Sequence, residues 1–147
     1  MMDEFKEGAR EELKRADHSI FVTLKYTRTS EVIKNIVARL ISAYEYAIDD
    51  VLNFALKKKK IKEIPHNYLD KAALTKKVMK GKNIKDHIEL YLLMKRIDKA
   101  GYTSKEEYRR HVTLVSDIGV NVKIETLMDY FNVVKEFIMI VDEWINK

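Results

Sequence analysis

Apolar residues recur every three or four positions over most of the chain, a spacing that places them along one face of an α-helix. The first such stripe predicts a helix over residues 3–25. It consists of Phe5, Ala9, Leu13, Ala16, Ile20 and Leu24. The periodicity then breaks at residues 26–30, where Thr29 or Ser30 offers a hydroxyl acceptor for the free amides that open the next helix.

A wider stripe predicts a second helix over residues 31–58. Its members are Ile33, Ile36, Val37, Leu40, Tyr44, Ala47, Ile48, Val51, Leu52 and Ala55. Because so short a connection joins two long helices, we expect them to pack antiparallel. Further along, residues 69–79 predict a short helix, and residues 83–100 predict a third long helix that stops at Gly101.

The segment between Gly101 and the last helix carries two different signals. Thr103 and Ser104 each stand three residues before a glutamate, which is the pattern of a capping box and predicts a short helix through residues 108–110. Apolar and polar residues then alternate over residues 111–124 around Gly119, which predicts a small β-hairpin. A last, strongly amphipathic helix follows over residues 125–146.

The predicted fold is therefore mainly α, a single helical-bundle domain over residues 1–147. We expect an antiparallel four-helix bundle with a short extra helix and a small β-hairpin before the last helix. Only four glycines and one proline punctuate the chain, too few for a many-stranded β fold. If the helices alternate in direction, the connections at 26–30 and 101–124 share one end of the bundle. The connection at 57–83 then lies at the other end, roughly 40 Å away.

Composition places the chain among folded proteins, since 46% of its residues are apolar and 35% are charged. It has no cysteine, so neither a disulfide nor a thiolate metal site can form. No apolar run approaches the roughly 20 residues of a membrane span, and the first fourteen residues are charged throughout. We therefore expect a cytoplasmic protein without membrane association. Abundant Lys, Glu and Ile without glutamine is typical of a thermophile, and also of an AT-rich genome.

Positive charge is concentrated in the 57–85 segment. Eleven lysines stand there against Glu63 and Asp70, a net of +9, whereas the whole chain carries +5 and the remainder therefore carries −4. The lysines expected at this end of the bundle are Lys57, Lys58, Lys59, Lys60, Lys76, Lys77, Lys80 and Lys82. They can contact nucleic-acid phosphates with little sequence discrimination. The alternative is a solvated connection whose charge only keeps it in solution.

A second basic group is expected at the opposite end. It contains Tyr26, Arg28, Tyr102, Tyr108, Arg109, Arg110 and His111. Guanidinium groups bind phosphates or carboxylates in a bidentate fashion, and aromatic rings stack on bases. The competing interpretation is that the arginines form local ion pairs with Glu106 and Glu107 at a helix end.

The chain shows no pattern of a metal, cofactor or catalytic centre. His18, His66, His87 and His111 lack metal-ligand spacing, and surface positions account for them. Solvent exposure likewise accounts for Glu45, Asp49 and Asp50 in the second helix. P-loop, dinucleotide-binding and hydrolase-elbow motifs are all missing from the sequence. We therefore expect no metal and no organic cofactor.

The order of two long antiparallel helices, a basic connection, a third helix and a long closing helix resembles the HEPN superfamily. The similarity covers roughly residues 3–146, and the stretch 40–47 (LISAYEYA) resembles the second helix of those domains. Ribonucleases of that superfamily carry an Arg followed by a His after four to six intervening residues. Arg109 and Arg110 instead directly precede His111, so no catalytic residue is carried over. The resemblance implies an RNA- or nucleotide-associated helical module, often a dimer.

These observations favour a non-enzymatic module that binds RNA or another polyanion through the basic ends of the bundle. One alternative is a structural module that pairs with itself or with a partner protein through exposed helix faces. A weaker alternative is a HEPN-like ribonuclease in which His111 transfers protons and Arg109 or Arg110 stabilises the developing phosphorane charge.

Overall fold

Most of the chain is helical in the computed structural model, which describes the backbone of residues 2–147 and the side chains of residues 8–147. The elements, in order, are α1 (Met2–His18), a π-helical turn (Ser19–Thr23), α2 (Leu24–Tyr26), α3 (Ser30–Lys57), α4 (Tyr68–Met79), α5 (Lys82–Lys99), β1 (Tyr102–Lys105), β2 (Thr113–Ser116), β3 (Asn121–Val122) and α6 (Ile124–Ile145). The predicted class is confirmed: mainly α, with a short extra helix and a small β-structure before the last helix. Among the described residues, no helix combines the length and apolarity needed to cross a bilayer.

The first predicted helix forms, but with a π-helical turn near its end. Ala9, Ala16, Ile20 and Leu24 are all buried, as their spacing predicted. Phe5, the first residue of that stripe, lies outside the described side chains. Ala16, Ile20 and Leu24 are spaced four residues apart. Because a regular α-helix has about 3.6 residues per turn, each four-residue spacing turns the next side chain further away from the core. The wider π turn between them lets both Ile20 and Leu24 face inward.

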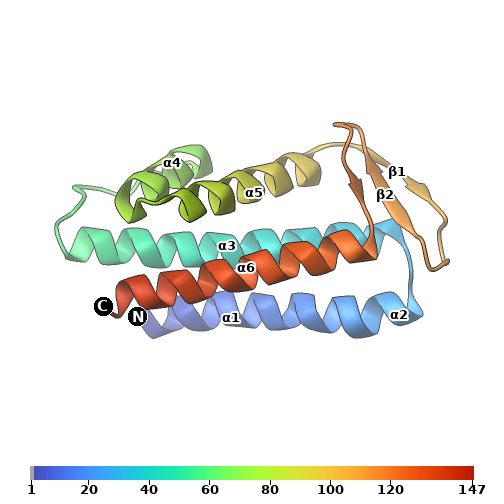
Figure 1. The fold of residues 1–147 in the computed structure, drawn as a ribbon, viewed down its shortest axis with the longest axis horizontal. Helices are drawn as coiled ribbons and strands as arrows, with labels where there is room; N and C mark the ends of the chain where they lie inside the picture. The colour runs from blue at the N-terminus through green and yellow to red at the C-terminus, as the bar shows by residue number, and fades with distance from the viewer. Residues whose placement is uncertain (1) are drawn as a thin grey trace.

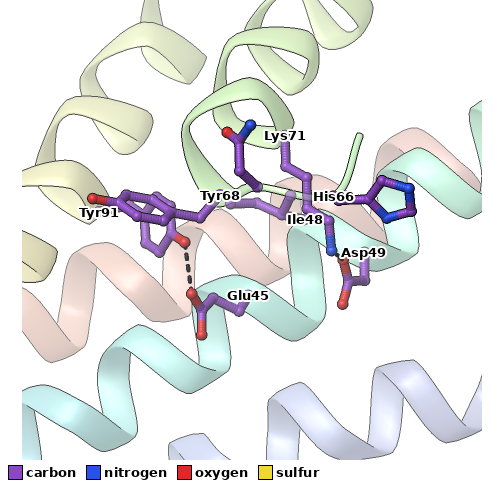
Figure 2. A pocket seen from close by; sticks show the side chains of 8 residues that line it. Glu45, Ile48, Asp49, His66, Tyr68, Lys71 and Tyr91 are labelled. Carbon is purple, nitrogen blue, oxygen red and sulfur yellow. Dashed lines mark hydrogen bonds and ion pairs between the residues drawn. The ribbon is translucent and has the colours of Figure 1, made fainter. Parts of the chain in front are cut away.

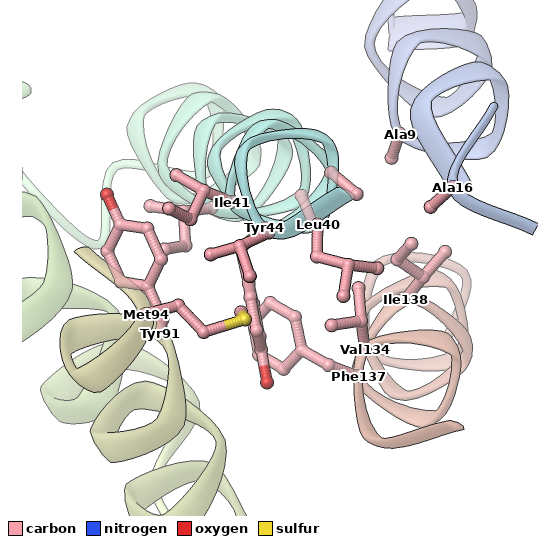
Figure 3. Packing of buried hydrophobic residues seen from close by; sticks show 14 of the residues in the cluster. Ala9, Ala16, Leu40, Ile41, Tyr44, Tyr91, Met94, Val134, Phe137 and Ile138 are labelled. Atoms are coloured by element: carbon pink, nitrogen blue, oxygen red, sulfur yellow. The ribbon is translucent and has the colours of Figure 1, made fainter. Parts of the chain in front are cut away.

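The long helix α3 lies at the centre of the molecule and contacts α1, α4, α5 and α6 (Figure 1). The hydroxyl Oγ1 of Thr29 accepts a hydrogen bond from the Val32 N–H at 3.2 Å, so the predicted N-cap is confirmed. Leu40, Ile41 and Tyr44 of α3 are buried among residues of all three neighbouring long helices (Figure 3). The wide stripe of the sequence corresponds to this burial on several sides.

Small residues let α1 approach α3 closely. Ala9 and Ala16 are fully buried on the side of α1 that faces the core (Figure 3). A Cβ atom added to Gly8 would lie only 2.7 Å from the ring of Tyr46 in α3. A larger residue at position 8 would therefore require the ring of Tyr46 to shift. The contact between the start of α1 and the second half of α3 confirms that the pair is antiparallel, as Figure 1 also shows.

The short helix in the basic connection begins one residue before the predicted start. The side chain of Asn67 caps it by accepting a hydrogen bond from the Asp70 N–H at 2.8 Å. α4 packs against both α3 and α5, so the chain folds back after leaving α3 and does not simply cross to α5 (Figure 1). This return path brings the C-terminal half of α4 near the end of α3.

The short helix predicted over residues 108–110 does not form. The capping-box residues Thr103 and Ser104 belong instead to β1, which pairs antiparallel with β2 and places Ser104 opposite Leu114. β3 pairs with the other edge of β2, so the predicted hairpin is present within a three-stranded sheet of order β1-β2-β3. Gly119, with a φ of +87°, lies in the turn between β2 and β3. Pairing with β2 therefore overrides the local helix signal.

The two ends of the bundle are arranged as the alternation of helix directions predicted. The connection after α2 and the sheet lie at one end, and the connection after α3 lies at the other (Figure 1). A backbone hydrogen bond from the Tyr108 N–H to the Arg28 carbonyl joins the two segments at the sheet end. The predicted separation of the two basic groups therefore exists in three dimensions.

Candidate functional site

The lysines at the end of α3 are held in place by the way the helix stops. Lys59 adopts a left-handed conformation with a φ of +60°. Its N–H donates to the Leu56 carbonyl at 3.1 Å, and the Lys60 N–H donates to the Ala55 carbonyl at 2.8 Å. This pair of bonds is a Schellman motif, which satisfies carbonyls at the helix terminus. The side chains of Lys57, Lys58, Lys59 and Lys60 are all exposed there.

Beyond this turn, the chain and α4 enclose a surface hollow of about 690 Å³. Four lysines line it, namely Lys60 and Lys62 from the connection and Lys77 and Lys80 from the end of α4. Its remaining lining is Ile61, Leu74, Val78 and one acidic residue, Glu63. We call the lysines of the hollow, together with Lys57, Lys58, Lys59, Lys76 and Lys82, the lysine end.

Aromatic rings support two of these lysines. The ammonium of Lys60 lies 5.0 Å from the ring centroid of Trp144, and that of Lys58 lies 5.7 Å from the ring centroid of Phe54. The two rings contact each other edge to face, with their centroids 5.3 Å apart. Cation–π contacts of this kind restrict a long side chain while leaving its charge open to solvent. The end of α6 therefore helps to position the positive charge.

The opposite end gathers the second predicted group. Tyr26, Tyr108, Arg109, Arg110 and His111 are exposed there, and Arg28 is half-buried. The alternative ion pairs of Arg109 and Arg110 with Glu106 and Glu107 are not found among the side chains that the structure describes. A ribonuclease role for His111 stays a prediction.

Sequence reasoning missed a polar hollow between α3, α4 and α5, shown in Figure 2. Glu45 and Asp49 are half-buried in its wall, where exposure was predicted. The Tyr91 hydroxyl donates to Oε2 of Glu45 at 2.7 Å, and Lys71 pairs with Asp49 at 3.1 Å. Burial raises the pKa of Tyr91 far above its ordinary value, and the hydrogen bond to Glu45 is the second contribution in the same direction. Each carboxylate thus already has a partner from another helix.

Two other polar residues are buried where the sequence predicted exposure, namely Asp50 in α3 and His87 in α5. Nδ1 of His87 lies 3.5 Å from the Tyr44 hydroxyl, and Nε2 lies 3.9 Å from Oε1 of Glu136 in α6. Burial lowers the pKa of His87, against the opposing effect of Glu136 and then Asp86. The helical pattern carries the signal for His87, which stands three positions after Ile84 and four before Tyr91 on the buried face of α5.

Metal chemistry has no donor set in the described part of the chain, where no group of three or more His, Asp or Glu side chains is arranged to hold an ion. Of the surfaces described, the lysine end combines the highest charge with a shaped recess. Comparison with known protein families, with curated proteins and with solved structures finds no match to this chain.

Proposed function

We propose that this protein is a non-enzymatic helical module that binds RNA or another polyanion through its lysine end. The observation that carries the proposal is the hollow lined by Lys60 and Lys62 of the connection together with Lys77 and Lys80 at the end of α4. Glu63 is the single acidic residue in that lining, so the hollow carries a net charge of +3.

A phosphate backbone suits this arrangement better than an isolated anion does. Lys60 belongs both to the exposed helix end and to the hollow, so the two groups of lysines adjoin, and each lysine can replace a counterion on a phosphate. Ammonium groups act as point charges and do not read base edges, so binding discriminates little between sequences. The apolar floor of Ile61, Leu74 and Val78 offers a contact for sugars or unpaired bases.

The proposal is tested by measuring the binding of a labelled single-stranded RNA by fluorescence anisotropy at several salt concentrations. Binding is expected to weaken steeply as salt rises. The variant Lys60→Gln/Lys77→Gln/Lys80→Gln removes three charges from the hollow. It should lower the slope of log K against log salt by roughly 2, since each single-strand phosphate contact contributes about 0.7.

A matched control separates this surface from the charge of the whole chain. The variant Lys14→Gln/Lys25→Gln/Lys135→Gln removes the same charge from exposed positions on α1, α2 and α6. We expect its salt slope to stay close to that of the parent. Equal losses in the two variants, or RNA binding that ignores salt, would contradict a binding role for the lysine end.

A further inference from the structure

The hollow at the lysine end has an apolar floor, which a surface that only attracts polyanions does not need. Ile61 of the connection and Leu74 and Val78 of α4 form this floor, and all three are half-buried. The volume of the hollow, about 690 Å³, lies within the range typical of small-molecule sites. Such sites combine apolar walls with a few polar groups at fixed positions. The hollow therefore has the features of a ligand pocket as well as those of a charged surface.

Helix α4 carries two apolar rows. The row on its core side consists of Ala72, Thr75 and Met79, the first two of which are small. Leu74 and Val78 stand four positions apart in a second row, which borders the hollow. They contact the core cluster but remain partly exposed. The second row thus extends the apolar surface of α4 beyond its core side and into the hollow.

The composition of the lining indicates an aliphatic ligand. Among the described side chains, none that lines the hollow is aromatic. Unpaired nucleobases gain affinity mainly by stacking on aromatic rings, whereas an alkyl chain needs only apolar surface to cover. The floor therefore suits an alkyl chain better than a base.

The backbone at Lys80 indicates a role for its side chain at the rim of the hollow. Its φ is +57° and its ψ is +158°, a combination that residues other than glycine rarely adopt. Strained residues of this kind cluster at functional sites. A glycine would fit the same backbone with less strain, but it would bring no ammonium group to the rim.

We propose that the hollow binds an anionic amphiphile, a molecule with one negatively charged head group and an aliphatic chain, such as a fatty-acid carboxylate. The head group pairs with the lysines of the rim, and the chain lies on the apolar floor. Lysine ammonium groups act as point charges, so they accept a carboxylate or a phosphate head alike. The ligand binds as a free molecule, because the floor residues are half-buried, whereas insertion into a membrane requires apolar side chains that protrude.

This ligand uses the surface proposed for the polyanion, but its binding does not depend on that proposal. RNA binding there is governed by charge and weakens with salt, whereas amphiphile binding strengthens with each methylene group that is buried. The test contains no nucleic acid, so either proposal can fail while the other holds.

Isothermal titration calorimetry of the purified full chain with acetate, octanoate and decanoate tests the proposal, each below the concentration at which it forms micelles. Decanoate should bind roughly tenfold more tightly than octanoate, since each buried CH₂ contributes up to about fourfold. Acetate, which has no chain, should show no binding. Octyltrimethylammonium has the same chain length as octanoate but a positive head, and it should not bind either.

The rim is tested with the variant Lys77→Gln/Lys80→Gly, which removes two charges and relieves the strain at position 80. The Kd for decanoate should rise roughly fivefold, as expected for the loss of two exposed ion pairs. The Tm should not fall, so the lost affinity cannot be ascribed to unfolding. The control Lys14→Gln/Lys25→Gln removes the same charge from exposed positions on α1 and α2, and it should leave the Kd unchanged.

The floor is tested with Val78→Thr, which keeps the shape of the side chain but replaces a methyl group by a hydroxyl. This variant should raise the Kd for decanoate about threefold. Val133→Thr makes the same change at a half-buried position of α6 outside the hollow, and it should leave the Kd unchanged.

Three results overturn the proposal: octanoate and decanoate bind equally, octyltrimethylammonium binds as tightly as octanoate, or the control variants lose as much affinity as their counterparts. Lack of decanoate binding overturns it as well. Binding to phosphatidylglycerol vesicles in place of free decanoate would assign the surface to a membrane instead.

Discussion

The carboxylate of Glu107 accepts a hydrogen bond at Oε1 from the backbone N–H of Ser30, with the two atoms 3.3 Å apart. Ser30 is the first residue of α3, and Glu107 belongs to the turn between β1 and β2, 77 positions away in the sequence. A negative charge at a helix N-terminus is favourable because the first amides have no partner within the helix. The side chain of Ser30 strengthens the junction through its 2.6 Å hydrogen bond with the Ser104 hydroxyl.

This contact predicts that Glu107→Ala destabilises the fold. The substitution leaves the Ser30 N–H without its acceptor and removes a charge from the start of α3. We expect a loss of about 1 kcal/mol in the free energy of unfolding, as for other helix caps. Urea denaturation followed by circular dichroism measures it. Glu11→Ala, at an exposed position on α1, should change that free energy much less, and an equal effect of both would show that Glu107 does not cap α3.

A substitution at Lys59 is predicted to increase the free energy of unfolding. Lys59 holds a left-handed conformation at the position of the Schellman motif where glycine is preferred. Lys59→Gly should relieve the steric cost of the side chain and stabilise the fold by about 1 kcal/mol. Lys58→Gly removes the same charge one residue earlier, where φ is −86°. There glycine only adds freedom to the unfolded chain, so a stabilisation by Lys58→Gly would refute the conformational explanation.

His87 predicts how stability depends on pH. Burial lowers its pKa below the ordinary value of 6.5, so the unfolded chain binds a proton more readily than the folded one. The contribution of neutral His87 is therefore complete above pH 6.5 and is lost as the pH falls below that value. The loss approaches about 1.4 kcal/mol per pH unit at most for one proton.

The variant His87→Leu places an apolar side chain in this buried site and removes the titrating group. Denaturation midpoints measured between neutral and mildly acidic pH should then fall less steeply for the variant than for the parent. His18→Gln, at an exposed position, should retain the pH dependence of the parent. If His87→Leu shows the same slope as the parent, another group is responsible for the acid sensitivity.

The long helices could be located from the sequence alone because their signals are local. The second helix was predicted over residues 31–58 and spans Ser30–Lys57, and the short helix was predicted over 69–79 and spans Tyr68–Met79. Apolar spacing, a capping hydroxyl and a terminal glycine all act within a few residues of each other. Such signals do not depend on the rest of the fold.

Strand β1 could not be predicted in this way. All four of its residues, Tyr102–Lys105, are exposed, so no alternation of buried and exposed positions marks them as a strand. Their hydroxyl groups instead match a helix cap. Only pairing with the buried strand β2 defines the segment, and that pairing spans positions that the local pattern does not connect.

The same distinction between local sequence signals and helix packing applies to the candidate site. The sequence by itself determined how much positive charge the 57–85 segment carries and, through the alternation of helix directions, that this charge lies opposite the arginines. Only the tertiary structure decided that α4 turns back to bring Lys77 and Lys80 beside Lys60, that Glu45 accepts a hydrogen bond from Tyr91, and that His87 packs against Phe137 of α6. Charge and helix periodicity are properties of neighbouring residues, whereas a hollow or a buried polar contact depends on how separate helices pack.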